Sequence, residues 1–244
     1  MLLIYGLYGR YGYGMGMFGD PTMILVLIGL ILSMIASGLV KSTFSKYSRV
    51  RSMSQMTGAQ AAERILHSAG IYDVSIARVS GSLTDHYDPR TKTLRLSDAT
   101  YGAASVAAVG VAAHECGHAI QHQQHYAPLV LRSTLVPAAN LGSSLSWPIF
   151  LVGLIASIPA LTTAGILLFG LAVLFQLVTL PVEINASRRA VRLLESTGVL
   201  GASENSGVKK VLTAAAFTYV ASLAASVLQL LRLIILAGGR RRND

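Results

Sequence analysis

Residues 133–182 read STLVPAANLGSSLSWPIFLVGLIASIPALTTAGILLFGLAVLFQLVTLPV and contain no charged side chain. One helix needs about 20 consecutive apolar residues to cross the core of a bilayer, so this run is long enough for two crossings. Near its middle, Ile158-Pro159 is typical of a turn, because the residue before a proline is driven out of the helical conformation. The sequence therefore predicts a helical hairpin in a membrane.

The composition of the whole chain also favours a membrane location. Of its 244 residues, 52% are hydrophobic and 13% are charged, which is far from the balance of a soluble domain. Residues 21–40 form another uncharged apolar run without a small-residue cleavage site, which indicates a retained transmembrane helix, with a buried core helix as the alternative. A third uncharged run, 211–231, ends at Arg232. We expect a mainly α-helical integral membrane protein with three or four transmembrane helices.

These runs divide the chain into seven segments. We expect a mobile Gly- and Tyr-rich N-terminus (1–20), a transmembrane helix (21–40), a cytoplasmic unit (41–132), the transmembrane hairpin (133–182), a polar segment (183–210), an apolar C-terminal helix that spans or lies on the membrane (211–237), and a basic tail (238–244). Within 41–132, Thr57 and Gln60 match a helix-capping box, residues 74–79 and 93–96 alternate like strands, and residues 103–123 suit one buried helix. These patterns predict a small α+β unit within this segment.

The formal charge of +9 indicates membrane lipids, not nucleic acid, as the partner of the basic residues. Lysines and arginines follow the first apolar run and surround the 183–210 segment, while the turn near Pro159 has none. By the positive-inside rule this side faces the cytoplasm. If residues 211–231 cross the membrane, however, the arginines at 240–242 end on the opposite side, and the sequence leaves that choice open.

The chemistry of the chain is indicated by the motif His114-Glu115-Cys116-Gly117-His118. Two histidines four positions apart lie on one face of a helix, so both imidazoles can bind one zinc ion. Glu115 lies about 100° around the helix and is placed to act as the general base that takes a proton from a zinc-activated water. Two satisfied core histidines are the alternative. Cys116, the only cysteine, points away from the histidine face and is predicted to be core.

A catalytic zinc keeps three protein ligands and one open position, so a residue outside this helix must complete the site. After His125 the chain has no histidine or cysteine, and Glu183 is the acid whose position is hardest to explain otherwise. It follows Leu180-Pro181-Val182 at the mouth of the hairpin, where an unpaired carboxylate is costly. An ion pair with Arg188 or Arg189 is the alternative. The rival ligands upstream are His67, Asp85, Asp88, Asp98 and, best placed, His86.

Four strings give the chain a resemblance to a known family: KSTF at 41–44, LTDHYDP at 83–89, HECGHAIQ at 114–121 and LPVEINASRRA at 180–190. The chain resembles the YugP-like bacterial membrane proteins classed as neutral zinc metallopeptidases. The resemblance implies a zincin-like (Glu-zincin) catalytic unit in the bacterial inner membrane, with one zinc held by His114, His118 and Glu183, and with Glu115 catalytic. One departure is Ser187, which stands where Glu-zincins have an acid that orients a histidine; Asn185 is the nearest polar substitute.

We therefore expect a zinc-dependent endopeptidase that acts on membrane or membrane-associated proteins. A non-enzymatic zinc-stabilised membrane scaffold and a zinc hydrolase of lipid-linked substrates are the alternatives. A peptide substrate is expected to pair with an edge strand at 93–96. His86, Tyr87 and Tyr219 are candidates to stabilise the oxyanion, and His122 and His125 are expected at the entrance or on the surface.

Overall fold

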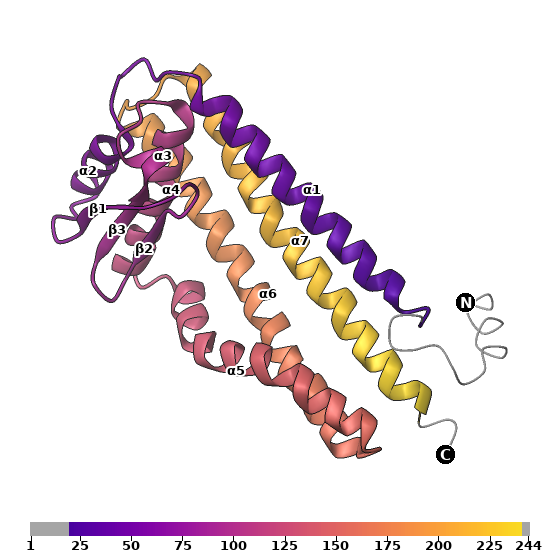
Figure 1. Ribbon diagram of the computed structural model, residues 1–244. Helices are drawn as coiled ribbons and strands as arrows, with labels where there is room; N and C mark the ends of the chain where they lie inside the picture. The colour runs from indigo at the N-terminus through magenta and orange to yellow at the C-terminus, as the bar shows by residue number, and fades with distance from the viewer. Residues whose placement is uncertain (1–19, 241–244) are drawn as a thin grey trace.

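The computed structural model describes residues 20–240, which are mostly helical. Four of the helices are long and apolar enough to cross a membrane, as the sequence predicts. They are α1 (Met23–Ser48), α5 (Ala127–Ile155), α6 (Pro159–Ser196) and α7 (Ala202–Arg240). At one end of these helices lies a small head of short helices and strands (Figure 1). The expectations for the N-terminus and for the last residues of the tail concern residues 1–19 and 241–244, which lie outside the described part.

Helices α5 and α6 form the predicted hairpin, with the turn at Ile158 and Pro159. Their backbones approach closely, since a Cβ on Gly142 would lie 2.4 Å from the carbonyl oxygen of Leu168. At the other end of the hairpin, α6 continues past Pro181 to Ser196. A proline costs a helix one backbone hydrogen bond, and neighbouring helices can compensate for it in a membrane protein. The same helix thus runs from the apolar hairpin into the head.

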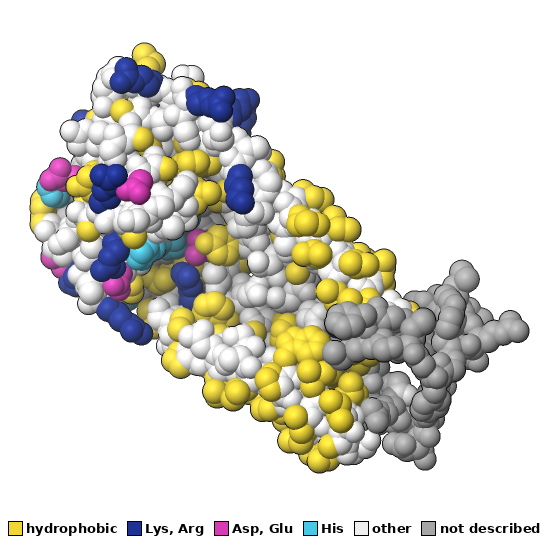
Figure 2. Space-filling view, viewed as in Figure 1, with side chains coloured by type: hydrophobic (Ala, Val, Ile, Leu, Met, Phe, Trp, Pro, Cys, Tyr) yellow, Lys and Arg dark blue, Asp and Glu magenta, His cyan; other side chains and the backbone are white. Residues whose placement is uncertain are grey.

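Helices α1 and α7 lie side by side along their length and run in opposite directions (Figure 1). Their far ends are joined by a partly buried ion pair between Arg232 of α7 and Asp20, which precedes α1, at 3.0 Å. Large apolar side chains of all four long helices are exposed, as expected for surfaces that face lipid (Figure 2). Helix α7 is thus long enough to cross a membrane. It packs along α1, another candidate transmembrane helix, and does not lie across the head.

The head contains a three-stranded sheet and three helices. The helices are α2 (Gly58–Ser68), α3 (Asp98–Tyr101) and α4 (Val106–Gln123), and the strands are β1 (Ser75–Val79), β2 (His86–Asp88) and β3 (Thr93–Ser97). The strand order is β1-β3-β2, with β1 parallel and β2 antiparallel to β3. The prediction of an edge strand at 93–96 is therefore wrong, because β3 is hydrogen-bonded on both sides. The edge strand beside α4 is β2.

Helix α4 is the centre of the head. Ser105 caps its N-terminus, because its side chain accepts a hydrogen bond from the amide of Ala108, and the helix is buried over most of its length. Its small side chains let α2, α6 and α7 pack closely around it. The predicted capping box of α2 is also present, since Thr57 and Gln60 exchange hydrogen bonds. This packing fixes α4 against the segment of α6 that follows the apolar hairpin.

Candidate metal centre

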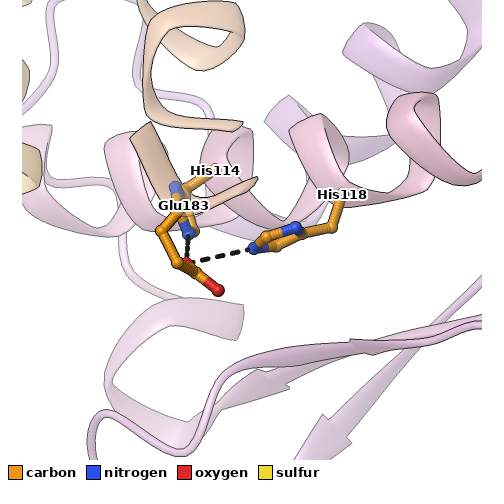
Figure 3. Close-up of side chains that lie close together, drawn as sticks. All are labelled: His114, His118 and Glu183. Atoms are coloured by element: carbon orange, nitrogen blue, oxygen red, sulfur yellow. Dashed lines mark ion pairs between the residues drawn. The ribbon is translucent and has the colours of Figure 1, made fainter. Parts of the chain in front are cut away.

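Three side chains from two helices converge at the junction of the head and the membrane helices. His114 and His118 lie one turn apart on α4, and Glu183 lies on α6 (Figure 3). The Oε2 atom of Glu183 is 3.3 Å from Nε2 of His114 and 3.4 Å from Nε2 of His118. The structure thus brings together the three residues that the sequence nominates as zinc ligands.

The close approach of α4 to α6 explains why Glu183 reaches the histidine face. Gly117 lies between the two histidines in sequence, and a Cβ added to it would lie 2.7 Å from the carbonyl oxygen of Ala186. Any larger residue would hold the helices apart. Ala186 is itself fully buried and small. The glycine of the motif therefore has a packing role that brings the third candidate ligand into position.

The donor atoms fit a divalent cation. Two ligand atoms about 2.1 Å from a tetrahedral zinc stand about 3.4 Å apart, which matches the distances from Glu183 to the two imidazoles. Oε2 of Glu183 is buried and accepts no hydrogen bond. Such an atom is costly unless it has a partner, and a cation between the carboxylate and the imidazoles would supply one. Among the described residues, this is the group of His, Cys, Asp and Glu side chains that could hold a metal ion.

Each imidazole is oriented by a polar partner at its other nitrogen. The amide of Gln121 donates to the carbonyl of Val182 and to Asn185, both at 2.9 Å, so its Oε1 atom must face His118. Oε1 lies 3.0 Å from Nδ1 of His118 and can only accept a hydrogen bond, which leaves Nε2 of His118 directed at Glu183. Partners of this kind fix the tautomer of metal-binding histidines.

Ser187 takes the corresponding role for the other histidine. Its hydroxyl lies 3.2 Å from Nδ1 of His114. The residue at which the sequence departs from the Glu-zincin pattern therefore still contacts a histidine of the motif. A neutral hydroxyl replaces the expected acid, and Asn185 acts through Gln121 on His118. Ser187 therefore orients His114 directly, and Asn185 orients His118 through Gln121.

Arg132 of α5 is a site residue that the sequence reasoning missed. Its Nη1 atom lies 3.4 Å from Oε1 of Glu183, the carboxylate oxygen that does not face the imidazoles. Arg189, proposed from the sequence as a partner of Glu183, instead contacts Asn185 and Gln124. No local spacing could have indicated Arg132, because it lies 51 positions before Glu183 and on the other arm of the hairpin.

Glu115 and Cys116 lie on different sides of α4. Glu115 is 7% exposed, and its side chain lines the cavity beside the three clustered residues. Cys116 is fully buried in the core of the head, as predicted, and burial raises the pKa of its thiol well above the ordinary value. The carboxylate can therefore reach a substrate that the thiol cannot.

The electrostatics of His118 reflect two opposing effects. Burial lowers the pKa of this imidazole, whereas the adjacent carboxylate of Glu183 and the negative charge of Glu115 raise it, and the net shift is upward. The negative charge around this imidazole also favours a bound cation, and a metal ion binds the neutral form of histidine.

The rival ligands named from the sequence have other partners. His86 contacts the carbonyl oxygen of Thr84, and His67 packs against the ring of Tyr72. The acids are engaged as well: Asp85 accepts hydrogen bonds from Ser97, Asp98 from Arg78 and Gly81, and Asp88 from Thr91 and Arg95. The hydrogen bonds from Thr91 and Arg95 hold the pKa of Asp88 well below its usual range. None of these five belongs to the cluster around Glu183.

A cavity of about 780 Å³ opens beside the cluster, between β2, α4 and α5. Figure 2 shows histidine side chains (cyan) in a recess where the head meets the apolar helices. His122 and His125 line this cavity, as the sequence predicts for entrance residues, and the hydroxyl of Tyr87 lies 2.9 Å from Nδ1 of His122. The volume falls within the range of about 300–1,000 Å³ that is typical of ligand sites.

Comparison with known proteins places this site in context. A family model described as "Putative neutral zinc metallopeptidase" matches residues 22–238. A relative described as "Putative membrane protease YugP", from Bacillus subtilis (strain 168), is 47% identical over 220 residues, which cover 90% of this chain and 98% of the relative. No solved structure matches the chain. The matched residues include the whole cluster and nearly all of the four long helices, and the chain belongs to the family described as "Putative neutral zinc metallopeptidase".

Proposed function

We propose that the protein is a membrane-embedded, zinc-dependent endopeptidase that cleaves membrane or membrane-associated proteins. The observation that carries the proposal is the buried Oε2 atom of Glu183, which has no hydrogen-bond partner and lies between the Nε2 atoms of two histidines of a metallopeptidase motif. His114, His118 and Glu183 would hold one zinc ion per chain. Family membership supports the metal, and the four long apolar helices support the membrane location.

The residues around the cluster have distinct proposed roles. Bound zinc would acidify a water molecule and polarise the carbonyl of the scissile peptide bond. Glu115 is buried beside the cluster without belonging to it, which leaves its carboxylate available as a base. It would accept the proton of the attacking water and pass it to the leaving amine. Arg132 orients Glu183 through its second oxygen, at 3.4 Å.

The peptide backbone of the substrate would lie along β2. This strand forms the edge of the sheet, and His86 and Tyr87 line the large cavity. An extended peptide can pair with such an edge through main-chain hydrogen bonds, whatever its side chains are. Tyr219 of α7 lies beside Glu183 and lines the same cavity, so its hydroxyl is the group best placed to bind the carbonyl oxygen in the transition state.

The geometry favours an enzyme over a structural zinc scaffold. A structural zinc is closed by four protein ligands, whereas the cluster among the described residues offers three. Glu115 is a carboxylate that lies beside the cluster without belonging to it. A cavity of about 780 Å³ opens onto the cluster. A scaffold needs neither of these features.

The site would face the cytoplasm. The head lies at one end of the four long helices, where α1 ends and α7 begins (Figure 1). Lysines and arginines are concentrated at this end, on the last turns of α1, the emergent part of α6 and the first turns of α7. If all four helices cross, the positive-inside rule places the head in the cytoplasm, although the end of α7 then carries arginine to the opposite side.

Proteomic comparison of membranes tests this function. Membranes that contain the native protein are compared with membranes that contain Glu115→Gln, and new protein N-termini are identified by mass spectrometry. We expect cleaved membrane proteins in the native sample only. Identical N-termini in both samples, with both proteins present at equal levels and loaded with zinc, would contradict the proposed function.

A further inference from the structure

A second cavity, of about 220 Å³, reaches the metal centre from the side of α1 and α7. The large cavity is bounded by β2 and α5 instead. The two cavities share Asp85, His114, Glu115, Glu183 and Tyr219. The metal centre therefore lies between a wide cavity that can admit a peptide and a smaller one on its other side.

The walls of the small cavity are mostly apolar and come from helices far apart in the sequence. They include Val40 and Phe44 of α1, Val111 of α4, and Val211, Leu212 and Ala215 of α7. Water gains little beside such apolar walls. This space is therefore suited to an apolar group that is brought in from outside.

The size and the floor of the cavity restrict what that group can be. A volume of about 220 Å³ is below the range of about 300–1,000 Å³ for whole ligands and suits a single side chain. The floor is formed by polar groups, including the carboxylates of Glu115 and Glu183. The end of a lipid acyl chain would leave those carboxylates without partners, whereas a peptide brings its own amide groups to them.

We propose that the small cavity binds one large apolar side chain of the substrate, on the residue next to the scissile bond. This inference rests on the proposed peptidase function and adds to it a preference for substrates with a large apolar residue at that position. Helix α1 is then more than a membrane anchor, because Val40 and Phe44 form part of the substrate site. The small side chain of Ala215 leaves the space that the substrate fills.

Substitution of Ala215 tests the specificity. Native protein is expected to cleave a peptide with leucine next to the scissile bond at least about 10-fold faster than the same peptide with alanine, measured as kcat/KM. Ala215→Leu fills the cavity and should remove that preference. Val220→Leu, on the exposed face of α7, is the matched control and should keep it. A full leucine preference in Ala215→Leu would overturn the proposal.

A crosslinking measurement makes the test independent of turnover. Zinc-loaded Glu115→Gln is irradiated with a peptide that contains a photoreactive leucine, and the crosslinked residues are mapped by mass spectrometry. We expect crosslinks to Phe44 or Val211, reduced at least 10-fold when Ala215→Leu is added. Crosslinks confined to Leu129, Val130 and Val136, which line the large cavity, would overturn the proposal. A native protein that cleaves no peptide contradicts the peptidase function instead, so the two failures are distinguishable.

Discussion

Gly117 of α4 lies directly against the backbone of Ala186 of α6, so closely that a Cβ on the glycine would lie 2.7 Å from the alanine carbonyl oxygen. This contact is the point at which the motif helix meets the helix that emerges from the membrane. Glu183 lies one turn before Ala186 on α6, which places its carboxylate opposite both histidines. The distance between the two helices therefore controls the geometry of the proposed zinc site.

Gly117→Ala should damage both the fold and the site. The added methyl group overlaps a backbone atom that cannot rotate away, and overpacking of this kind costs about 1–3 kcal/mol of stability. We expect a lower melting temperature and weaker zinc binding, measured by thermal unfolding and by competition with a chelator. Gly170→Ala on α6, where the structure shows open space, is the control and should change neither. Native zinc affinity in Gly117→Ala would show that α6 does not set the ligand distance.

Gln121→Leu should weaken zinc binding without removing a ligand. The substitution takes away the acceptor that orients His118 and the donor to Val182 and Asn185. Loss of such a partner typically costs about 10- to 100-fold in metal affinity. Gln121→Glu keeps the acceptor for His118 and should retain more of the affinity. Equal affinities in the two variants and the native protein would mean that His118 is held by packing alone.

Glu183→Gln distinguishes a zinc ligand from a structural ion-pair partner. If Glu183 binds zinc, the neutral amide should lower zinc affinity more than about 100-fold, beyond the effect of losing an outer partner. If it serves only to pair with Arg132, zinc should remain stoichiometric while the melting temperature falls. Dialysis against a mild chelator followed by metal analysis gives the answer. His86→Ala is the comparison, and zinc loss there with zinc retained in Glu183→Gln would move the third ligand to β2.

Single cysteines should report the orientation of the protein in the membrane. Cysteines at positions 50 and 195, both exposed in the head region, should react with an impermeant maleimide only after the cells are opened. A cysteine at position 158, in the exposed turn of the hairpin, should react in intact cells. The native Cys116 is fully buried and should stay silent in the folded protein. The reverse labelling pattern would place the site outside the cytoplasm.

Features with a local cause were predictable from the sequence. The spacing of His114 and His118 depends only on the pitch of a helix, and the hairpin turn depends on Pro159 within a long uncharged run. The capping box of α2 is likewise a local pattern. Glu183 was identified because few acids remained after the motif, and because an unpaired carboxylate at a membrane boundary needs an explanation.

Features that depend on tertiary packing were missed or wrong. Alternation along residues 93–96 predicts a strand but not its neighbours, so the sequence could not show that β3 lies inside the sheet. Glu195 pairs with Lys209 of the next helix, at 3.5 Å, a partner that local spacing within α6 cannot indicate. Arg132 escaped notice for the same reason, since the fold of the hairpin alone brings it to Glu183.

The most direct measurement of the central claim combines metal analysis with peptide cleavage for native protein and Glu115→Gln. Glu115 lines the cavity but is not part of the metal-binding cluster, so its loss should remove the base and leave the ligands in place. We expect about one zinc per chain in both proteins, cleavage by the native protein, and a loss of rate of at least about 100-fold in Glu115→Gln. Zinc-loaded Glu115→Gln that cleaves the peptide as fast as the native protein would contradict the account.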